Sequence, residues 1–143
     1  MNVVKAYPPN IEKIKKVFPI QKNTVFTYGD TLYAPGIDFK IPPDLLIHEQ
    51  THTIQQAGDP EAWWDKYLVD PTFRYQQELE AYRNQYRFIC KFVKGRNERF
   101  HHLRTLAQDF ASPLYGSIVG FLEATELIKS WYTHVSQTLA IGR

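Results

Sequence analysis

The chain has 143 residues, 43% of them hydrophobic and 15% aromatic, which suits one domain with a hydrophobic core. Its 17 basic and 15 acidic residues leave a net charge of +2, so the composition gives no support to a nucleic-acid or anionic-membrane partner. Cys90 is the single cysteine, which excludes an intramolecular disulfide.

The N-terminal segment MNVVKAYPPN has no apolar run long enough for a signal peptide. No stretch approaches the roughly 20 apolar residues that are needed to span a bilayer. We therefore expect a cytoplasmic protein made without export, in which residues 1–143 form a single domain.

Two stretches in the first quarter of the chain have regular patterns. Residues 8–18 (PPNIEKIKKVF) place isoleucine and phenylalanine on one face and lysines on the other, which predicts a short amphipathic helix. Residues 24–34 are rich in β-branched and aromatic side chains on both sides of Gly29-Asp30. This pattern predicts a hairpin, or a strand with a tight turn.

The segment from Pro43 to Gly58 contains the sequence HEQTH, an HExxH motif. Prolines and an aspartate at its start, and glycine at its end, predict a helix. Residues four apart lie about 40° from each other around a helix axis, so His48 and His52 can share one zinc ion. Glu49 can accept a proton from a zinc-bound water without being a ligand. The alternative is a chance match with two satisfied core histidines.

Asp59-Pro60 and Asp70-Pro71 each combine an N-cap aspartate with proline at the first helical position. The first predicts a short helix whose aromatic residues belong in the core or, alternatively, line a peptide groove. These aromatic residues are Trp63, Trp64 and Tyr67. The remaining segments are expected to be a helix over about residues 71–94, a turn over residues 94–99, a helix over residues 99–111, and a last helix from Ser112-Pro113 to about residue 138.

The long helix over about residues 71–94 supplies the candidate for a third ligand. Glu78 lies about 60° from the centre of its predicted buried face, whereas Glu80 lies about 140° away. A carboxylate near a buried face is costly unless it is paired or bound to a metal, which favours Glu78. The predicted buried face consists of Tyr75, Leu79, Tyr82, Tyr86, Ile89 and Val93.

Both glutamates also have an explanation without metal. Glu78 can be a carboxylate at the helix edge that pairs with Arg74. Glu80 is expected to form surface ion pairs with Arg83 or Arg87, which contribute little to stability.

An HExxH motif followed by a glutamate on a later helix resembles the gluzincin metallopeptidases, and the sequence from Glu78 to Ala81 fits the E-x-x-A pattern of many small members. The resemblance covers about residues 24–94. It implies zinc bound by His48, His52 and Glu78, with Glu49 as general base. It also implies a mainly helical α+β fold, a compact zincin-like domain with a small β-hairpin or sheet beside the HExxH helix. HEQTHTIQQ is also similar to the motif helix of small predicted zincins, including phage-encoded ones.

The sequence departs from the gluzincin pattern at Tyr82, where many members have aspartate or asparagine. A different group must therefore orient the histidines. The chain is also short for a protease with a deep substrate cleft. Tyr115 and His134 are the candidates for stabilising an oxyanion, and the alternative for Tyr115 is a core position with its hydroxyl satisfied.

These features favour zinc-dependent hydrolysis of a peptide or protein substrate. The alternative from another class is a structural or assembly component, for example of a phage particle, that keeps a zincin fold but has little turnover. A third reading is a toxin-type or regulatory protease that acts on one protein in the cell.

Overall fold

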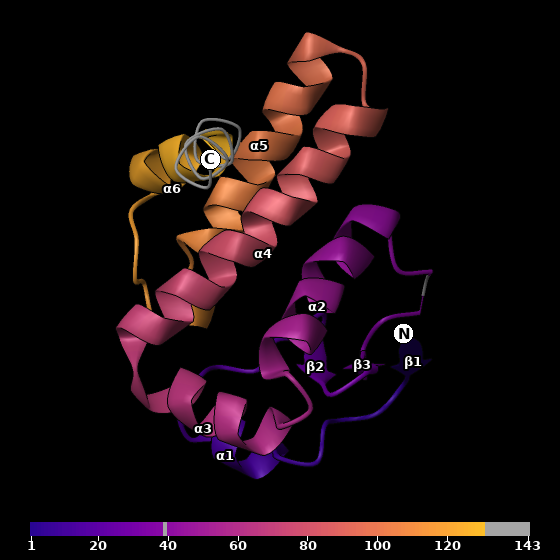
Figure 1. Cartoon of the computed structure of the whole chain (residues 1–143), viewed down its shortest axis with the longest axis vertical. Coiled ribbons are helices and arrows are strands. Elements are labelled where there is room, and N and C mark those ends of the chain that lie inside the picture. Colours follow the sequence, from indigo (N-terminus) through magenta and orange to yellow (C-terminus); the bar gives the residue numbers. More distant parts are fainter. Residues whose placement is uncertain (39, 131–143) are drawn as a thin grey trace, which may run out of the picture.

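A computed structural model describes residues 1–38 and 40–130, and it shows a mainly helical α+β fold, as the sequence predicts (Figure 1). The elements in chain order are β1 (Asn2–Val4), α1 (Ile11–Lys15), β2 (Phe26–Tyr28), β3 (Thr31–Tyr33), α2 (Pro43–Gln56), α3 (Pro60–Val69), α4 (Pro71–Phe92), α5 (Arg96–Phe110), a 3₁₀ turn (Pro113–Tyr115) and α6 (Phe121–Lys129).

The predicted hairpin is confirmed, and it belongs to a three-stranded sheet of order β1-β3-β2. Strands β2 and β3 are antiparallel, with Phe26 opposite Tyr33. Gly29 in the connecting turn has a φ of 64°, a left-handed conformation that glycine adopts without strain. Strand β1 pairs with β3 in parallel and was not predicted, because three exposed residues give no alternating pattern.

Helix α4 runs through the middle of the molecule, with α2 and the sheet on one side and α5 and α6 on the other (Figure 1). The largest buried cluster lies between α4, α5 and α6 and includes Tyr82, Leu106 and Phe110. A second cluster joins α1, β2 and α3 and contains Trp63, Trp64 and Tyr67. The aromatic residues of α3 therefore belong to the core, as expected.

The predicted helix starts after aspartate are confirmed. The Asp59 side chain accepts a hydrogen bond from the backbone N–H of Ala62, and the Asp70 side chain accepts one from that of Phe73. Gly58 follows the C-cap of α2 and has a φ of 80°, which fits its predicted C′ position.

The predicted turn over residues 94–99 is too long, because α5 already begins at Arg96. Gly95 has extended backbone, and the charged residues that follow it are good helix formers. The predicted start of the last helix at Ser112-Pro113 is wrong. Only a 3₁₀ turn forms there, because Gly116 and Ser117 both adopt left-handed backbone. Helix α6 begins at Phe121, and the end of the predicted helix lies outside the described residues.

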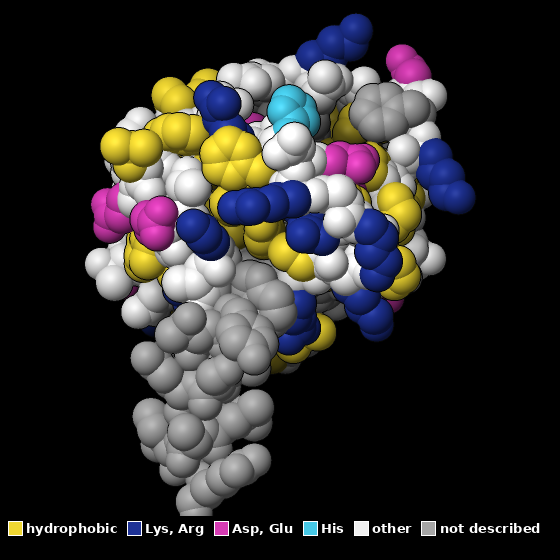
Figure 2. Space-filling view, turned by 90° about the horizontal axis from the view of Figure 1, so that it is seen from above, with side chains coloured by type: hydrophobic (Ala, Val, Ile, Leu, Met, Phe, Trp, Pro, Cys, Tyr) yellow, Lys and Arg dark blue, Asp and Glu magenta, His cyan; other side chains and the backbone are white. Residues whose placement is uncertain are grey.

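Charge is unevenly distributed despite the small net charge. Residues 83–104 contain seven lysines and arginines but a single acidic residue, Glu98. They surround the turn between α4 and α5, and Figure 2 shows basic side chains gathered around hydrophobic ones at this end of the molecule. Among the described helices, none has the length and apolar character required to cross a bilayer.

Candidate metal centre and active site

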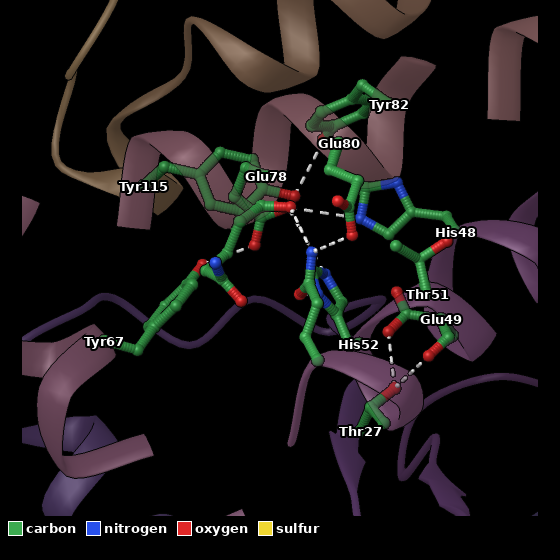
Figure 3. A network of polar contacts seen from close by, with 12 residues as sticks. Thr27, His48, Glu49, Thr51, His52, Tyr67, Glu78, Glu80, Tyr82 and Tyr115 are labelled. Carbon is green, nitrogen blue, oxygen red and sulfur yellow. Dashed lines mark hydrogen bonds and ion pairs between the residues drawn. The ribbon is translucent and has the colours of Figure 1, made fainter. Parts of the chain in front are cut away.

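Helix α2 places both motif histidines in the protein interior. His48 is 3% exposed and His52 is 5% exposed, and their rings pack edge to face with centroids 4.9 Å apart. Both rings point from the same side of α2 toward α4, as the spacing of four residues requires (Figure 3).

Helix α4 brings Glu78 to the same place. Its side chain is 2% exposed, and its Oε1 lies 3.2 Å from Nε2 of His48 and 3.4 Å from Nε2 of His52. One ligand atom from each of the three residues lies within 4.8 Å of the other two. Ligands about 2.0–2.1 Å from a tetrahedral zinc are separated by about 3.4 Å, so the two distances from Oε1 of Glu78 to the histidine nitrogens fit a zinc ion. The structure thus brings together the three residues that the sequence singled out.

An amide from α4 fixes the orientation of His48. Oε1 of Gln85 lies 2.9 Å from Nδ1 of His48, while Nε2 of Gln85 donates to Oδ2 of Asp44 at 2.8 Å. Because a carboxylate can only accept, the amide oxygen must face His48, and Nδ1 of His48 must donate. The lone pair of Nε2 is then left facing Glu78, where a metal would bind.

A second amide does the same for His52. Oε1 of Gln55 lies 2.8 Å from Nδ1 of His52, and its Nε2 donates to Oε1 of Glu80 and to the carbonyl of Gln77. The expectation that Glu80 pairs with Arg83 or Arg87 is therefore wrong. Helix α2 approaches Glu80 closely enough for Gln55 to reach it, and Arg83 instead donates to the carbonyl of Leu127.

The second carboxylate oxygen of Glu78 is held by a tyrosine. The hydroxyl of Tyr67 on α3 donates to Oε2 of Glu78 at 2.6 Å. The alternative partner, Arg74, is also buried, but it donates to the carbonyls of Tyr67 and Tyr115. The ion pair between Glu78 and Arg74 does not form, so Glu78 has no cationic partner other than the two histidines within the described residues.

Burial and charge act in opposite directions on this cluster. Burial alone lowers the pKa of His52, but the charge of Glu78 and its hydrogen bond outweigh burial and raise the pKa to about 9. Burial alone would raise the pKa of Glu78, but His52 and His48 hold it well below its usual range. Without metal, a proton on His52 therefore balances the charge of the Glu78 carboxylate.

Glu49 lies next to His48 on α2, beside strand β2, and lines one cavity together with the ligand candidates His52 and Glu78 (Figure 3). It is 6% exposed, and its Oε2 accepts a hydrogen bond from the hydroxyl of Thr27 on β2 at 2.6 Å. The carbonyl of Thr27 in turn accepts from Gln56 and Trp64, which fixes β2 against α2 and α3. Glu49 is thus an oriented carboxylate outside the set of three ligand atoms.

Two cavities meet at His48 and Glu49. One is narrow, about 60 Å³, and is lined mainly by aromatic and aliphatic side chains such as Phe18 and Trp64. The other is an open cleft of about 370 Å³, within the range of small-ligand sites. Tyr115 lines both, and its hydroxyl lies 2.7 Å from that of Tyr82.

Tyr115 therefore lies beside the cluster, where an oxyanion stabiliser would be needed. Burial raises its pKa well above the usual value, which keeps the hydroxyl protonated and able to donate. The other candidate, His134, lies outside the described residues.

Sequence reasoning missed the residues that orient the ligands. The signal for Gln85 was present, because it follows Glu78 by seven residues and so shares its helix face. Gln55 follows His52 by three residues, so its contact with His52 could also have been predicted from helix spacing. Thr27 and Tyr67 reach the site from β2 and α3, and no local spacing indicates those contacts.

Comparisons with protein-family models, curated proteins and solved structures gave no match to this chain.

Proposed function

We propose that the protein is a zinc-dependent peptidase in which His48, His52 and Glu78 hold the metal. The support is the donor set itself: two imidazole nitrogens and one carboxylate, all buried, at spacings that suit zinc. In both imidazoles Nδ1 faces an oxygen acceptor, as in most zinc-binding histidines, and here the acceptors are the side-chain amides of Gln85 and Gln55. Three protein ligands leave a fourth position for water or substrate, as catalytic rather than structural zinc sites do.

Zinc in such a site supplies Lewis acidity, which polarises a carbonyl and lowers the pKa of bound water to near neutral. Glu49 is the general base in this proposal. It lines both cavities beside His48 and has Thr27 as its single side-chain partner within the described residues. It can take a proton from the attacking water and deliver it to the leaving amine.

Tyr115 is proposed to donate a hydrogen bond to the oxygen of the scissile carbonyl as negative charge develops there. Its hydroxyl already faces another hydroxyl, that of Tyr82, so it can turn to a new acceptor without leaving a buried charge. The open cleft of about 370 Å³ offers room for a short stretch of peptide.

The substitution Glu49→Gln separates an enzyme from a metal-binding scaffold. It keeps the shape of the side chain and all three proposed ligands, and it removes only the base. We expect the zinc-loaded Glu49→Gln protein to keep wild-type zinc content and unfolding temperature but to cleave no peptide in a broad library that the wild type cleaves.

Equal activity of Glu49→Gln and wild type would mean that the proposed mechanism is wrong. A wild-type protein that binds zinc but cleaves nothing in the library would favour the structural or assembly role instead.

A further inference from the structure

Arg74 on α4 is a buried cation that the proposed reaction does not use. Its side chain is 6% exposed, and it forms no ion pair with any carboxylate of the described residues. It does not line either cavity at the site, so it contacts no substrate in the proposed reaction. A buried charge is costly unless other groups compensate it, and the contacts of Arg74 show what it holds in place.

The guanidinium of Arg74 joins two separate segments through their backbone carbonyls. Nη1 donates to the carbonyl of Tyr67 at 2.7 Å, and Nε donates to the carbonyl of Tyr115 at 2.9 Å. Tyr67 lies in the last turn of α3, where carbonyls lack partners within the helix and the negative end of the dipole favours a cation. These contacts compensate the buried charge and connect α3 and the 3₁₀ turn to α4.

The 3₁₀ turn that carries Tyr115 has little regular structure of its own. It is three residues long, and Gly116 and Ser117 after it have left-handed backbone. Nη2 of Arg74 lies against this backbone, because a Cβ atom added at Gly116 would be 3.2 Å from it. Tyr115 is therefore held at both ends, its carbonyl by Arg74 and its hydroxyl by the hydroxyl of Tyr82.

Both groups that hold Tyr115 lie on the helix face that supplies the proposed metal ligand. Arg74, Glu78 and Tyr82 follow one another at intervals of four residues, so one face of α4 carries all three. The position of Tyr115 relative to the metal site is thus set by one helix. A donor to a developing oxyanion is most effective when it is fixed in place before the reaction.

We propose that Arg74 is a positioning residue, which holds the 3₁₀ turn so that the hydroxyl of Tyr115 can reach the scissile carbonyl. The inference rests on the proposed peptidase function. Arg74 acts through Tyr115 and contacts neither the metal ligands nor the substrate, so its loss should affect the transition state more than substrate binding.

The test begins with Arg74→Lys, which keeps the charge but replaces the planar fork with a single ammonium that cannot take the place of both Nε and Nη1. The zinc-loaded variant should keep wild-type zinc content and KM, and its kcat should fall by about tenfold to a hundredfold. The matched control is Arg83→Lys. Arg83 is also on α4 and donates through Nε to a backbone carbonyl, but that carbonyl belongs to Leu127 on α6. It should keep wild-type kcat.

A double substitution distinguishes positioning from a general loss of structure. Tyr115→Phe removes the proposed donor itself, so Arg74→Lys should lower kcat little further when the two are combined. A merely structural role for Arg74 predicts that the two effects on kcat multiply. All proteins are assayed well below their unfolding temperatures. If Arg74→Lys does not fold, Gly116→Ala takes its place, because its methyl group displaces the guanidinium from the turn.

Nuclear magnetic resonance of isotope-labelled tyrosine rings gives a measurement that needs no turnover. The Tyr115 signal is assigned by its absence in Tyr115→Phe. It should shift in zinc-loaded Arg74→Lys and stay in place in Arg83→Lys. An unshifted Tyr115 signal in Arg74→Lys overturns the inference, whether or not the protein is a peptidase.

The remaining outcomes separate failure of this inference from failure of the proposed function. An active wild type with wild-type kcat in Arg74→Lys, or with multiplying effects in the double variant, overturns the inference and leaves the peptidase intact. Loss of zinc from Arg74→Lys also overturns it, because Arg74 would then act on Glu78 through Tyr67. A zinc-loaded wild type that cleaves no peptide overturns both.

Discussion

Oε1 of Gln85 lies 2.9 Å from Nδ1 of His48, although the two residues belong to different helices. Gln85 is two turns after Glu78 on α4, so one helix face supplies both a proposed ligand and the group that orients another ligand. Asp44 holds the other end of the same amide. The gluzincin resemblance leads one to expect an aspartate or asparagine at position 82 to orient the histidines, and here Gln85 contacts His48 instead.

Removal of this amide should weaken metal binding without removing a ligand. We predict that Gln85→Ala lowers zinc affinity by about 10–100-fold, because the tautomer and angle of His48 are no longer fixed. Competition with a chromophoric chelator measures this directly. Gln76→Ala, an exposed position on the same helix, should leave the affinity unchanged. Equal affinities of Gln85→Ala and wild type would show that packing alone orients His48.

The two glutamates of α4 should behave differently. Glu78→Ala removes a proposed ligand and should release zinc at concentrations where the wild type holds it. Glu80→Ala removes only an acceptor for Gln55, and we expect it to keep zinc and to lose about 1 kcal/mol of stability or less. Zinc retention during dialysis measures the first effect, and urea unfolding measures the second. Release by Glu80→Ala but not by Glu78→Ala would contradict the site described above.

Thr27 should affect turnover but not zinc binding. Thr27→Val keeps the size of the side chain and removes the hydroxyl that holds Glu49, so we predict unchanged zinc content and a kcat lower by on the order of tenfold. The matched control is Thr31→Val in the neighbouring strand, whose hydroxyl donates to the exposed Asp30 and to no other side chain within the described residues. A Thr27→Val protein that is as active as Thr31→Val would show that Glu49 needs no support from the sheet.

The metal-free protein should become less stable as pH rises above neutral. The pKa of His52 is raised from 6.5 to about 9 in the folded protein, so its protonated form favours folding. This stabilisation is complete below pH 6.5 and is lost as pH rises through about 9. With a chelator present, the urea midpoint should be higher at pH 6 than at pH 9.5. His52→Gln should reduce that difference, and an undiminished difference would assign the pH dependence to other groups.

The elements with local signals were predictable. The caps at Asp59 and Asp70, the hairpin around Gly29 and the motif helix all depend on contacts within a few residues, and the structure has them. The position of Glu78 on the inner side of α4 also followed from helix geometry. The complete burial of Glu78 did not follow, because other helices cover α4 on two sides, whereas the sequence pattern predicted one buried face.

The errors came from contacts that are distant in sequence or from backbone that breaks a pattern. Glu80 was assigned to arginines on its own helix, but Gln55 of α2 reaches it first. The helix expected from Ser112-Pro113 is interrupted by left-handed backbone at Gly116 and Ser117, which residue type alone did not indicate.

The metal content of the purified protein tests the central claim most directly. Protein purified without chelator or added metal should contain one zinc per chain by elemental analysis, and the double substitution His48→Ala/His52→Ala should contain none while it keeps its helical content. Wild-type protein without zinc that also binds none on titration, or a double variant that binds zinc as the wild type does, would contradict the assignment of this site.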